Sequence, residues 1–245
     1  MGIATYIKSI FYPPKCAVCR NTLELSRNCP FCADCQYELS RALSQKCRDC
    51  RNDMHQCTCV PSSLKNEGFL FHAKLFGYNP SDRTDPVNRL VYTMKASERR
   101  ELYDWLALML EPELKGAISA ACQTSSLRPV ITYVPRSKKS VAKYGFDQAE
   151  LLARALSRRL SISTVSAVKR KNLNDAEMKK LNAASRFSAG ANAFEPVLGC
   201  SVGKGDLLII VDDVLTSGAS VYWTAKTASA LGVTDFAVCT VAKTC

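Results

Sequence analysis

The most informative part of the chain reads Leu207-Leu208-Ile209-Ile210-Val211-Asp212-Asp213-Val214-Leu215-Thr216-Ser217-Gly218-Ala219-Ser220. It opens with five consecutive apolar residues, a run that is typical of a strand buried on both faces. Two adjacent carboxylates stand where that strand should end, and a short loop then leads into an expected helix. Because ligands of open α/β sheets bind at the carboxyl ends of the strands, the segment predicts a ligand site at this point.

The loop has the chemistry of a phosphate site. A helix N-terminus offers unpaired N–H groups and a partial positive charge, and both attract a phosphate. Gly218 lets the backbone approach a ligand closely, and Thr216, Ser217 and Ser220 can donate hydrogen bonds from their hydroxyls. Asp pairs and Thr-Ser-Gly turns also occur where nothing is bound, so the order of the parts carries more weight than any single part.

Taken in order, the segment resembles the phosphoribosyl-pyrophosphate (PRPP) signature of the type I phosphoribosyltransferases. The resemblance implies an α/β fold in which a parallel sheet is flanked by helices. It also implies that Asp212 and Asp213 face the ribose hydroxyls and that Mg²⁺ accompanies PRPP. The 5′-phosphate would then lie in the loop formed by Thr216, Ser217, Gly218, Ala219 and Ser220.

The N-terminal part is rich in cysteine, with nine of the 13 cysteines in the first 59 residues. Two Cys-x-x-Cys pairs can supply the four thiolates of a tetrahedral zinc site. The spacing of a zinc ribbon predicts a first set made of Cys16, Cys19, Cys32 and Cys35. A second set could be formed by Cys47, Cys50, Cys57 and Cys59, although its last pair is the tighter Cys-x-Cys. Cys29 could take the place of Cys35, and His55 could replace one ligand of the second set. We expect structural zinc to supply much of the folding free energy of this region.

A polar segment with Pro61, Ser62 and Ser63 marks the expected boundary between a zinc-ribbon domain, single or double, over residues 1–62 and an α/β domain over residues 63–245. In the second domain we expect a helix that begins at Ser97 and ends near Pro112, a buried strand over Pro129–Val134, and a long polar loop over residues 169–192. No apolar run reaches the roughly 18 residues of a membrane span, and no signal-peptide pattern is present. The sequence therefore predicts a cytoplasmic protein with no membrane insertion.

Lysine and arginine exceed aspartate and glutamate by 11. The excess is concentrated between Arg136 and Lys171, where ten basic residues accompany two acidic ones. Such a segment favours a polyanion, either pyrophosphate or nucleic acid, although a solvated helix face can have the same composition. For single-stranded DNA, phosphate-binding charges and a stacking ring are offered by Lys138, Lys139, Lys143 and Tyr144.

Nearly the whole chain is similar to the ComF (ComFC/GntX) family. The residues that carry the similarity are Phe31-Cys32-Ala33-Asp34-Cys35, Tyr92-Thr93-Met94-Lys95, Val134-Pro135-Arg136, Tyr144-Gly145-Phe146-Asp147-Gln148 and Asp212 to Ser220. The resemblance implies a zinc ribbon joined to a phosphoribosyltransferase-like domain, with a role in DNA uptake during natural transformation. It also places a pyrophosphate loop at Pro135, Arg136 and Ser137.

The chain departs from the family pattern in two places. Tyr144 and Asp147 stand where the family usually has Arg and Asn. In the later polar segment Arg186 and Phe194 fit, whereas Met178 and Ala189 replace the usual Gln and Asn. Because that segment would cover the active site, the departures bear on catalysis more than on PRPP binding.

Three functions are compatible with these features. The first is a competence factor that binds PRPP-like groups and single-stranded DNA through the phosphoribosyltransferase fold. The second is an active phosphoribosyltransferase of nucleotide metabolism, an enzyme of the glycosyltransferase class. The third is a zinc-dependent adaptor to a competence helicase or another DNA-processing protein, with a vestigial site. No catalytic acid or base stands out in the sequence.

Overall fold

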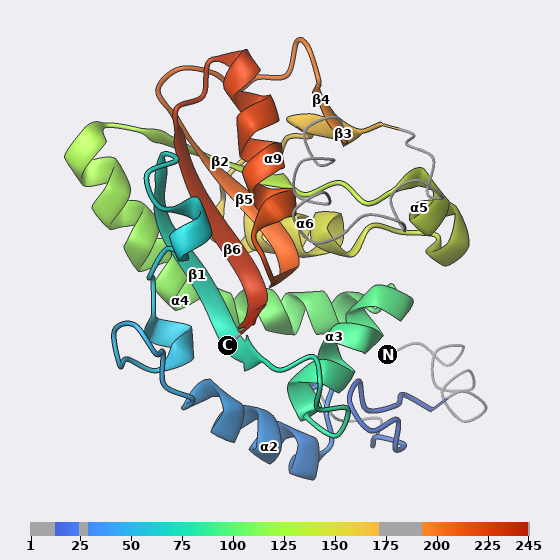
Figure 1. Cartoon of the computed structure of the whole chain (residues 1–245). Helices are drawn as coiled ribbons and strands as arrows, with labels where there is room; N and C mark the ends of the chain where they lie inside the picture. Colours follow the sequence, from blue (N-terminus) through green and yellow to red (C-terminus); the bar gives the residue numbers. More distant parts are fainter. Residues whose placement is uncertain (1–12, 25–28, 172–192, 245) are drawn as a thin grey trace.

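The computed structural model describes residues 13–24, 29–171 and 193–244 (Figure 1). Most of the predicted polar loop, including Met178, Arg186 and Ala189, lies outside these residues. Its first residues, Lys169 and Arg170, lie in the short strand β3 (Val168–Arg170), which pairs antiparallel with β4 (Phe194–Pro196) beyond the loop.

The main sheet of the described residues has four strands in the order β1-β6-β5-β2, and every neighbouring pair is parallel. The strands are β1 (Phe69–Tyr78), β2 (Arg128–Tyr133), β5 (Asp206–Leu215) and β6 (Asp235–Thr244). The apolar run at Leu207–Val211 has no solvent exposure, because helices cover both faces of the sheet. The structure confirms the predicted α/β class with its parallel sheet.

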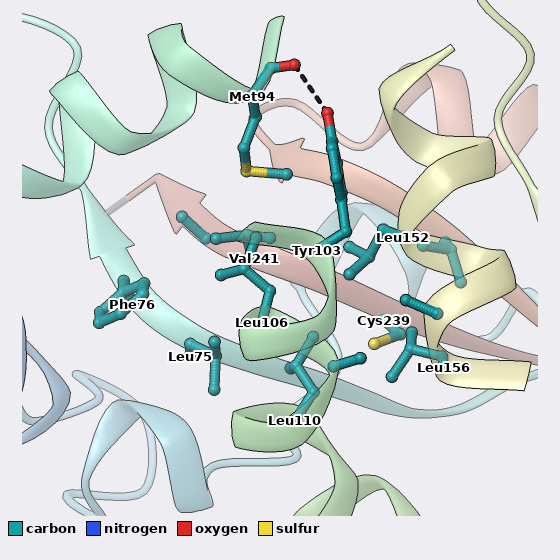
Figure 2. Packing of buried hydrophobic residues seen from close by; sticks show 14 of the residues in the cluster. Leu75, Phe76, Met94, Tyr103, Leu106, Leu110, Leu152, Leu156, Cys239 and Val241 are labelled. Carbon is teal, nitrogen blue, oxygen red and sulfur yellow. Dashed lines mark hydrogen bonds between the residues drawn. The ribbon is translucent and has the colours of Figure 1, made fainter. Parts of the chain in front are cut away.

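The helices form a layer on each face of the sheet (Figure 1). One face is covered by α3 (Pro86–Ala96), α4 (Arg100–Ser125) and α6 (Gln148–Leu160), and the other by α9 (Ala219–Ala228). Figure 2 shows the first of these cores, in which apolar side chains of α4 and α6 pack against β1 and β6. The Tyr103 hydroxyl also donates a 2.9 Å hydrogen bond to the Met94 carbonyl, which ties α4 to α3.

The long helix differs from the expectation. It begins at Arg100 rather than Ser97, and it continues through Pro112 to Ser125. Proline removes one backbone donor, which leaves the carbonyl of Leu108 without its helical partner. The Leu108 side chain is 47% exposed, so water can reach that turn, while Leu114 and Ile118 bury the helix beyond it. Burial of this second half outweighs the local cost of the proline.

The segment after β2 also differs from the expected basic loop. Residues Lys138–Tyr144 form the short helix α5, which Ser137 caps and Gly145 ends with a φ of 83°. The next helix, α6, begins at Gln148, because the Asp147 carboxylate accepts hydrogen bonds from the Ala149 and Glu150 amides. The caps at Ser137 and Asp147 therefore set where α5 and α6 begin, and so fix the path of the chain after β2.

The cysteine-rich region packs directly on the α/β core. Its helix α2 (Ala33–Leu43) buries Leu39, and the Phe31 ring lies edge-on to Trp105 of α4 at 4.7 Å. The short turns η1 (Met54–Gln56) and η2 (Ser62–Leu64) lead from this region to β1. The predicted division into domains at residue 62 stays a prediction. Across the described part of the chain, no helix combines the length and the apolar character needed to cross a bilayer.

Candidate functional site

A cleft of about 710 Å³ opens at the carboxyl ends of β1, β2 and β5. This is the end of a parallel sheet at which α/β proteins bind their ligands. The cleft combines the predicted acid pair with the predicted pyrophosphate loop and part of the phosphate loop. It is lined by Tyr78, Lys95, Val134, Pro135, Arg136, Ser137, Lys138, Lys139, Ser140, Gln148, Arg170, Lys171, Asp212, Asp213, Val214, Thr216 and Ser220.

The acid pair lies inside strand β5 rather than beyond it. On the β6 side, pairing continues past the acids to Leu215, whereas on the β2 side the last pair joins Val211 to Tyr133. The amide of Val134 then donates to the Val211 carbonyl at 2.9 Å, and the chain turns away at Pro135. The strand therefore ends before the acids only on the β2 side, where its pairing stops. On that side the two acids line the cleft.

Both carboxylates are held by the backbone. Oδ1 of Asp212 accepts the Asp213 amide at 2.8 Å, and Oδ1 of Asp213 accepts the Val214 amide at 2.7 Å. Lys95 of α3 places its Nζ 3.4 Å from Oδ2 of Asp213, and Asp213 is only 6% exposed. Burial, together with the neighbouring charge of Asp213, raises the pKa of Asp212 well above its usual value.

The phosphate loop surrounds a small hollow next to the cleft. Asp212 and the predicted loop residues line this hollow, whose volume is about 40 Å³. Gly218 has a φ of 79° and stands immediately before α9, and a side chain there would come 2.9 Å from Ser63 Oγ. Glycine is therefore required both by the backbone conformation and by the contact with η2. The structure brings Thr216, Ser217, Gly218, Ala219 and Ser220 together at the helix N-terminus, as the sequence predicts.

The structure divides the basic segment into two groups. Arg154, Arg158 and Arg159 on α6 form surface ion pairs with Glu150, Asp104 and Glu111. A second group lines the cleft together with Lys95 of α3, and these cations outnumber the two acids there. From the basic segment it contains Arg136, Lys138, Lys139, Arg170 and Lys171. Positive potential is thus concentrated at the ligand site rather than along the whole segment.

Arg136 of the predicted pyrophosphate loop is held by internal contacts. Its guanidinium donates to the carbonyls of Lys95 at 3.1 Å and Phe146 at 3.4 Å, and it lies 4.4 Å from the centre of the Tyr144 ring. Its amide also donates to the Asp147 carboxylate at 2.6 Å. Burial raises the pKa of Asp147 although three backbone donors oppose the shift. Arg136 therefore positions the loop between β2 and α5.

The predicted DNA-binding residues do not all lie together. Lys138 and Lys139 line the cleft, whereas Lys143 and Tyr144 are not among its lining residues. Lys143 Nζ and the Arg136 guanidinium both approach the Tyr144 ring, at 4.8 and 4.4 Å from its centre. Because cations already contact this ring, its contribution to base stacking stays a prediction.

Sequence reasoning missed several lining residues. Lys95 and Gln148 belong to segments that are similar to the ComF family, but nothing in their spacing placed them beside the acid pair. Gln148 is 9% exposed, and its Oε1 has no hydrogen-bond partner among the described residues. An unpaired buried acceptor in a cleft wall is one that a ligand donor can satisfy. Arg170 and Lys171 come to the cleft because β3 pairs with β4, a long-range contact.

The two predicted cysteine sets are confirmed as clusters. The sulfur atoms of Cys16, Cys19, Cys32 and Cys35 lie within 4.8 Å of one another, and so do those of Cys47, Cys50, Cys57 and Cys59. Neither Cys29 nor His55 belongs to these groups in the part of the chain that the structure describes. His55 instead places Nδ1 2.9 Å from the Leu43 carbonyl oxygen.

The donor sets fit a tetrahedral zinc ion. Four thiolates suit zinc, and in each cluster a backbone amide two residues on approaches a sulfur at 3.4 Å: Val18 N to Cys16 and Cys59 N to Cys57. Burial alone would raise the pKa of Cys16, but backbone donors at Cys19, Cys32 and Val18 lower it to about 7. These donors favour the thiolate form of Cys16, whereas burial and neighbouring cysteines raise the pKa values of Cys35 and Cys59 while no metal is bound.

The comparisons with known proteins point in the same direction. No protein-family model matches the chain. Competence protein F of Haemophilus influenzae is 24% identical over 231 residues, which cover 93% of this chain and 96% of that protein. DNA utilization protein YhgH of Salmonella typhimurium is 32% identical over 142 residues, 58% of this chain and 60% of that protein. YhgH of Escherichia coli is 30% identical over 143 residues, also 60% of that protein.

The chain is thus similar, over nearly its whole length or over more than half of it, to proteins named for competence and for DNA utilization. Its ComF-like motifs converge in the structure: Val134-Pro135-Arg136, Lys95, Gln148 and the acid pair all line one cleft. The departure at Tyr144 also has a structural counterpart, because the Arg136 guanidinium lies over its ring.

Proposed function

We propose that this protein is a member of the ComF family that acts in DNA uptake and utilisation, and that its cleft binds phosphoribosyl groups together with single-stranded DNA. One observation carries the proposal: the acid pair, the phosphate loop and a cluster of basic residues surround a single cleft at the ligand-binding end of the sheet. The names of the related proteins, Competence protein F and DNA utilization protein YhgH, support the same role.

Each part of the cleft suits one part of a phosphoribosyl ligand. Asp212 and Asp213 offer oxygen acceptors for the ribose hydroxyls, and Lys95 keeps Asp213 in place. The loop at Thr216–Ser220 offers hydroxyls and a helix N-terminus for the 5′-phosphate. Lys138, Lys139 and Lys171 supply positive charge for a pyrophosphate or for the phosphates of a DNA strand. Mg²⁺, when bound with PRPP, would offset charge on the pyrophosphate.

The test is a pair of titrations on one preparation, with PRPP and Mg²⁺ in one and a single-stranded oligonucleotide in the other. The variant Asp212→Asn with Asp213→Asn keeps the acceptors that bind the Asp213 and Val214 amides and removes the two charges. Loss of charge-assisted hydrogen bonds should weaken PRPP binding about 10- to 100-fold. Unchanged PRPP affinity in the double variant would place the ligand elsewhere, and absence of DNA binding by the parent would remove the nucleic-acid half of the proposal.

A second candidate is an active phosphoribosyltransferase. The feature that favours it is Gln148, whose buried Oε1 lacks a partner among the described residues and offers a contact for an acceptor group beside the acid pair. Transfer would displace pyrophosphate from the ribose anomeric carbon, with the acids orienting the sugar. Release of pyrophosphate from PRPP in the presence of a nucleobase, and its loss in the double Asn variant, would establish this activity.

A third candidate, an adaptor to a competence helicase, draws on the cysteine-rich region. The two cysteine clusters would hold a rigid surface for a protein partner. This function would require neither PRPP nor DNA binding by the cleft, so failure of both titrations would favour it.

A further inference from the structure

Lys74, in the middle of the edge strand β1, is completely buried. A lysine is almost never fully buried unless its ammonium is paired. Among the described residues, no carboxylate forms an ion pair with it. Its Nζ donates instead to the Cys57 carbonyl at 2.7 Å, to the His72 carbonyl at 3.2 Å, and approaches Cys57 Sγ at 3.1 Å.

Cys57 belongs to the second cysteine cluster. A divalent ion held by four thiolates keeps two negative charges in excess, and those charges would lie next to the buried ammonium. A metal-bound tetrathiolate therefore supplies the negative charge that Lys74 otherwise lacks. Hydrogen bonds to a coordinating sulfur are also the contacts through which neighbouring groups tune and orient metal ligands.

The same cluster covers the free edge of the sheet. The His72 amide on β1 donates a 3.1 Å hydrogen bond to the carbonyl of Thr58, which stands between Cys57 and Cys59. An uncovered edge strand presents unpaired backbone groups and is prone to fraying and to wrong pairing. At its far end β1 reaches Tyr78, which lines the cleft. The cluster and the cleft are therefore linked by one strand.

We propose that Lys74 is the internal counter-charge of the second metal centre, and that metal binding at this centre holds the edge strand β1 in place through Lys74 and Thr58. The proposal concerns the cysteine region and the sheet edge, and it is independent of what the cleft binds. It gives the second centre a role different from the first, whose cysteines pack in the same core as α3 and α4.

The experiment measures zinc release from the full-length, zinc-loaded protein to a colorimetric chelator. Lys74→Met keeps the length of the side chain and removes its charge. One of two zinc ions per chain should then leave about 10- to 100-fold faster than in the parent, as for the loss of other groups that support metal ligands. The matched control is Lys46→Met, which removes a 65% exposed charge next to Cys47, and it should release zinc at the parental rate.

Equal release rates in Lys74→Met and the parent would overturn the proposal, as would equal acceleration in both variants. A parent that contains only one zinc would show that the second centre is not a metal site, a separate failure. If Lys74→Met does not fold, hydrogen exchange of the parent decides. Chelation should expose the amides of residues 69–78 before those of residues 206–215, and unchanged protection of β1 after loss of both zinc ions would refute the coupling.

Discussion

Asp212 shows how a strand can hold a charge that folding does not favour. Its carboxylate lies in the sheet beside Asp213, and burial and that neighbouring charge raise its pKa. When the pKa of an acid is higher in the folded chain than in the unfolded chain, its ionisation destabilises the folded state. The free energy of unfolding therefore falls as the pH rises above the ordinary pKa of about 3.9. Such a cost is understandable if Asp212 presents negative charge to the proposed ligand.

We therefore expect Asp212→Asn to stabilise the ligand-free protein at neutral pH. The gain should be about 2–4 °C in Tm for each kcal/mol of ionisation cost removed, and it should disappear as the pH approaches about 4. Thermal unfolding between pH 4 and 8 provides the measurement. Asp104→Asn, on the exposed side of α4, serves as the control, and it should show no comparable rise. A stabilisation of Asp212→Asn that is the same at every pH would contradict this account.

Much of the residue-level site was predictable because it is local in sequence. The acid pair and Thr216–Ser220 follow one another in a single segment, and the close pairing of cysteines, three times as Cys-x-x-Cys and once as Cys-x-Cys, identified both clusters. Lys95, Arg170 and Lys171 could not be assigned, since only the packing of α3 and the β3–β4 pair brings them to the cleft. The access of the acids to the cleft also depends on where β2 stops pairing, which no property of β5 reveals.

At the scale of elements, the apolar run of β5 was enough to predict a buried strand, whereas local rules failed for α4. Pro112 predicted a helix end, but Leu114 and Ile118 continue the buried stripe, and packing outweighs the lost hydrogen bond. The cysteine-rich region gives the opposite lesson. The polar segment with Pro61, Ser62 and Ser63 predicted a boundary after this region, whereas Cys16 and Phe31 are buried in the same core as α3 and α4.

This shared core predicts the effect of breaking the first cluster. Cys16→Ser should lower the zinc content from two ions to one per chain and reduce Tm, because the buried contacts around Phe31 and Trp105 depend on the metal-held turn. Elemental analysis and thermal unfolding measure both effects. Cys29→Ser is the matched control, since Cys29 lies outside the cluster, and it should retain two zinc ions. Two zinc ions in Cys16→Ser would show that the first centre does not depend on this ligand.

At the scale of the whole molecule, the net charge of +11 matters less than its distribution. The arginines of α6 are paired with acids on their own helix and on α4, whereas lysines from three separate segments face the cleft. A DNA strand would therefore meet its phosphate contacts at the cleft rather than along α6. Two triple variants that remove the same total charge can separate these surfaces.

We expect Lys138→Ala, Lys139→Ala and Lys171→Ala together to weaken single-stranded DNA binding and to flatten its salt dependence. For single strands, each lost phosphate contact should reduce the slope of log K against log salt by about 0.7, so three contacts reduce it by about 2. The control combines Arg154→Ala, Arg158→Ala and Arg159→Ala, whose partners are surface carboxylates, and its slope should stay near that of the parent. Titrations over a series of salt concentrations give both slopes. Equal flattening in the two triples would mean that only net charge matters, and parental slopes in both would leave the adaptor function as the better account of this chain.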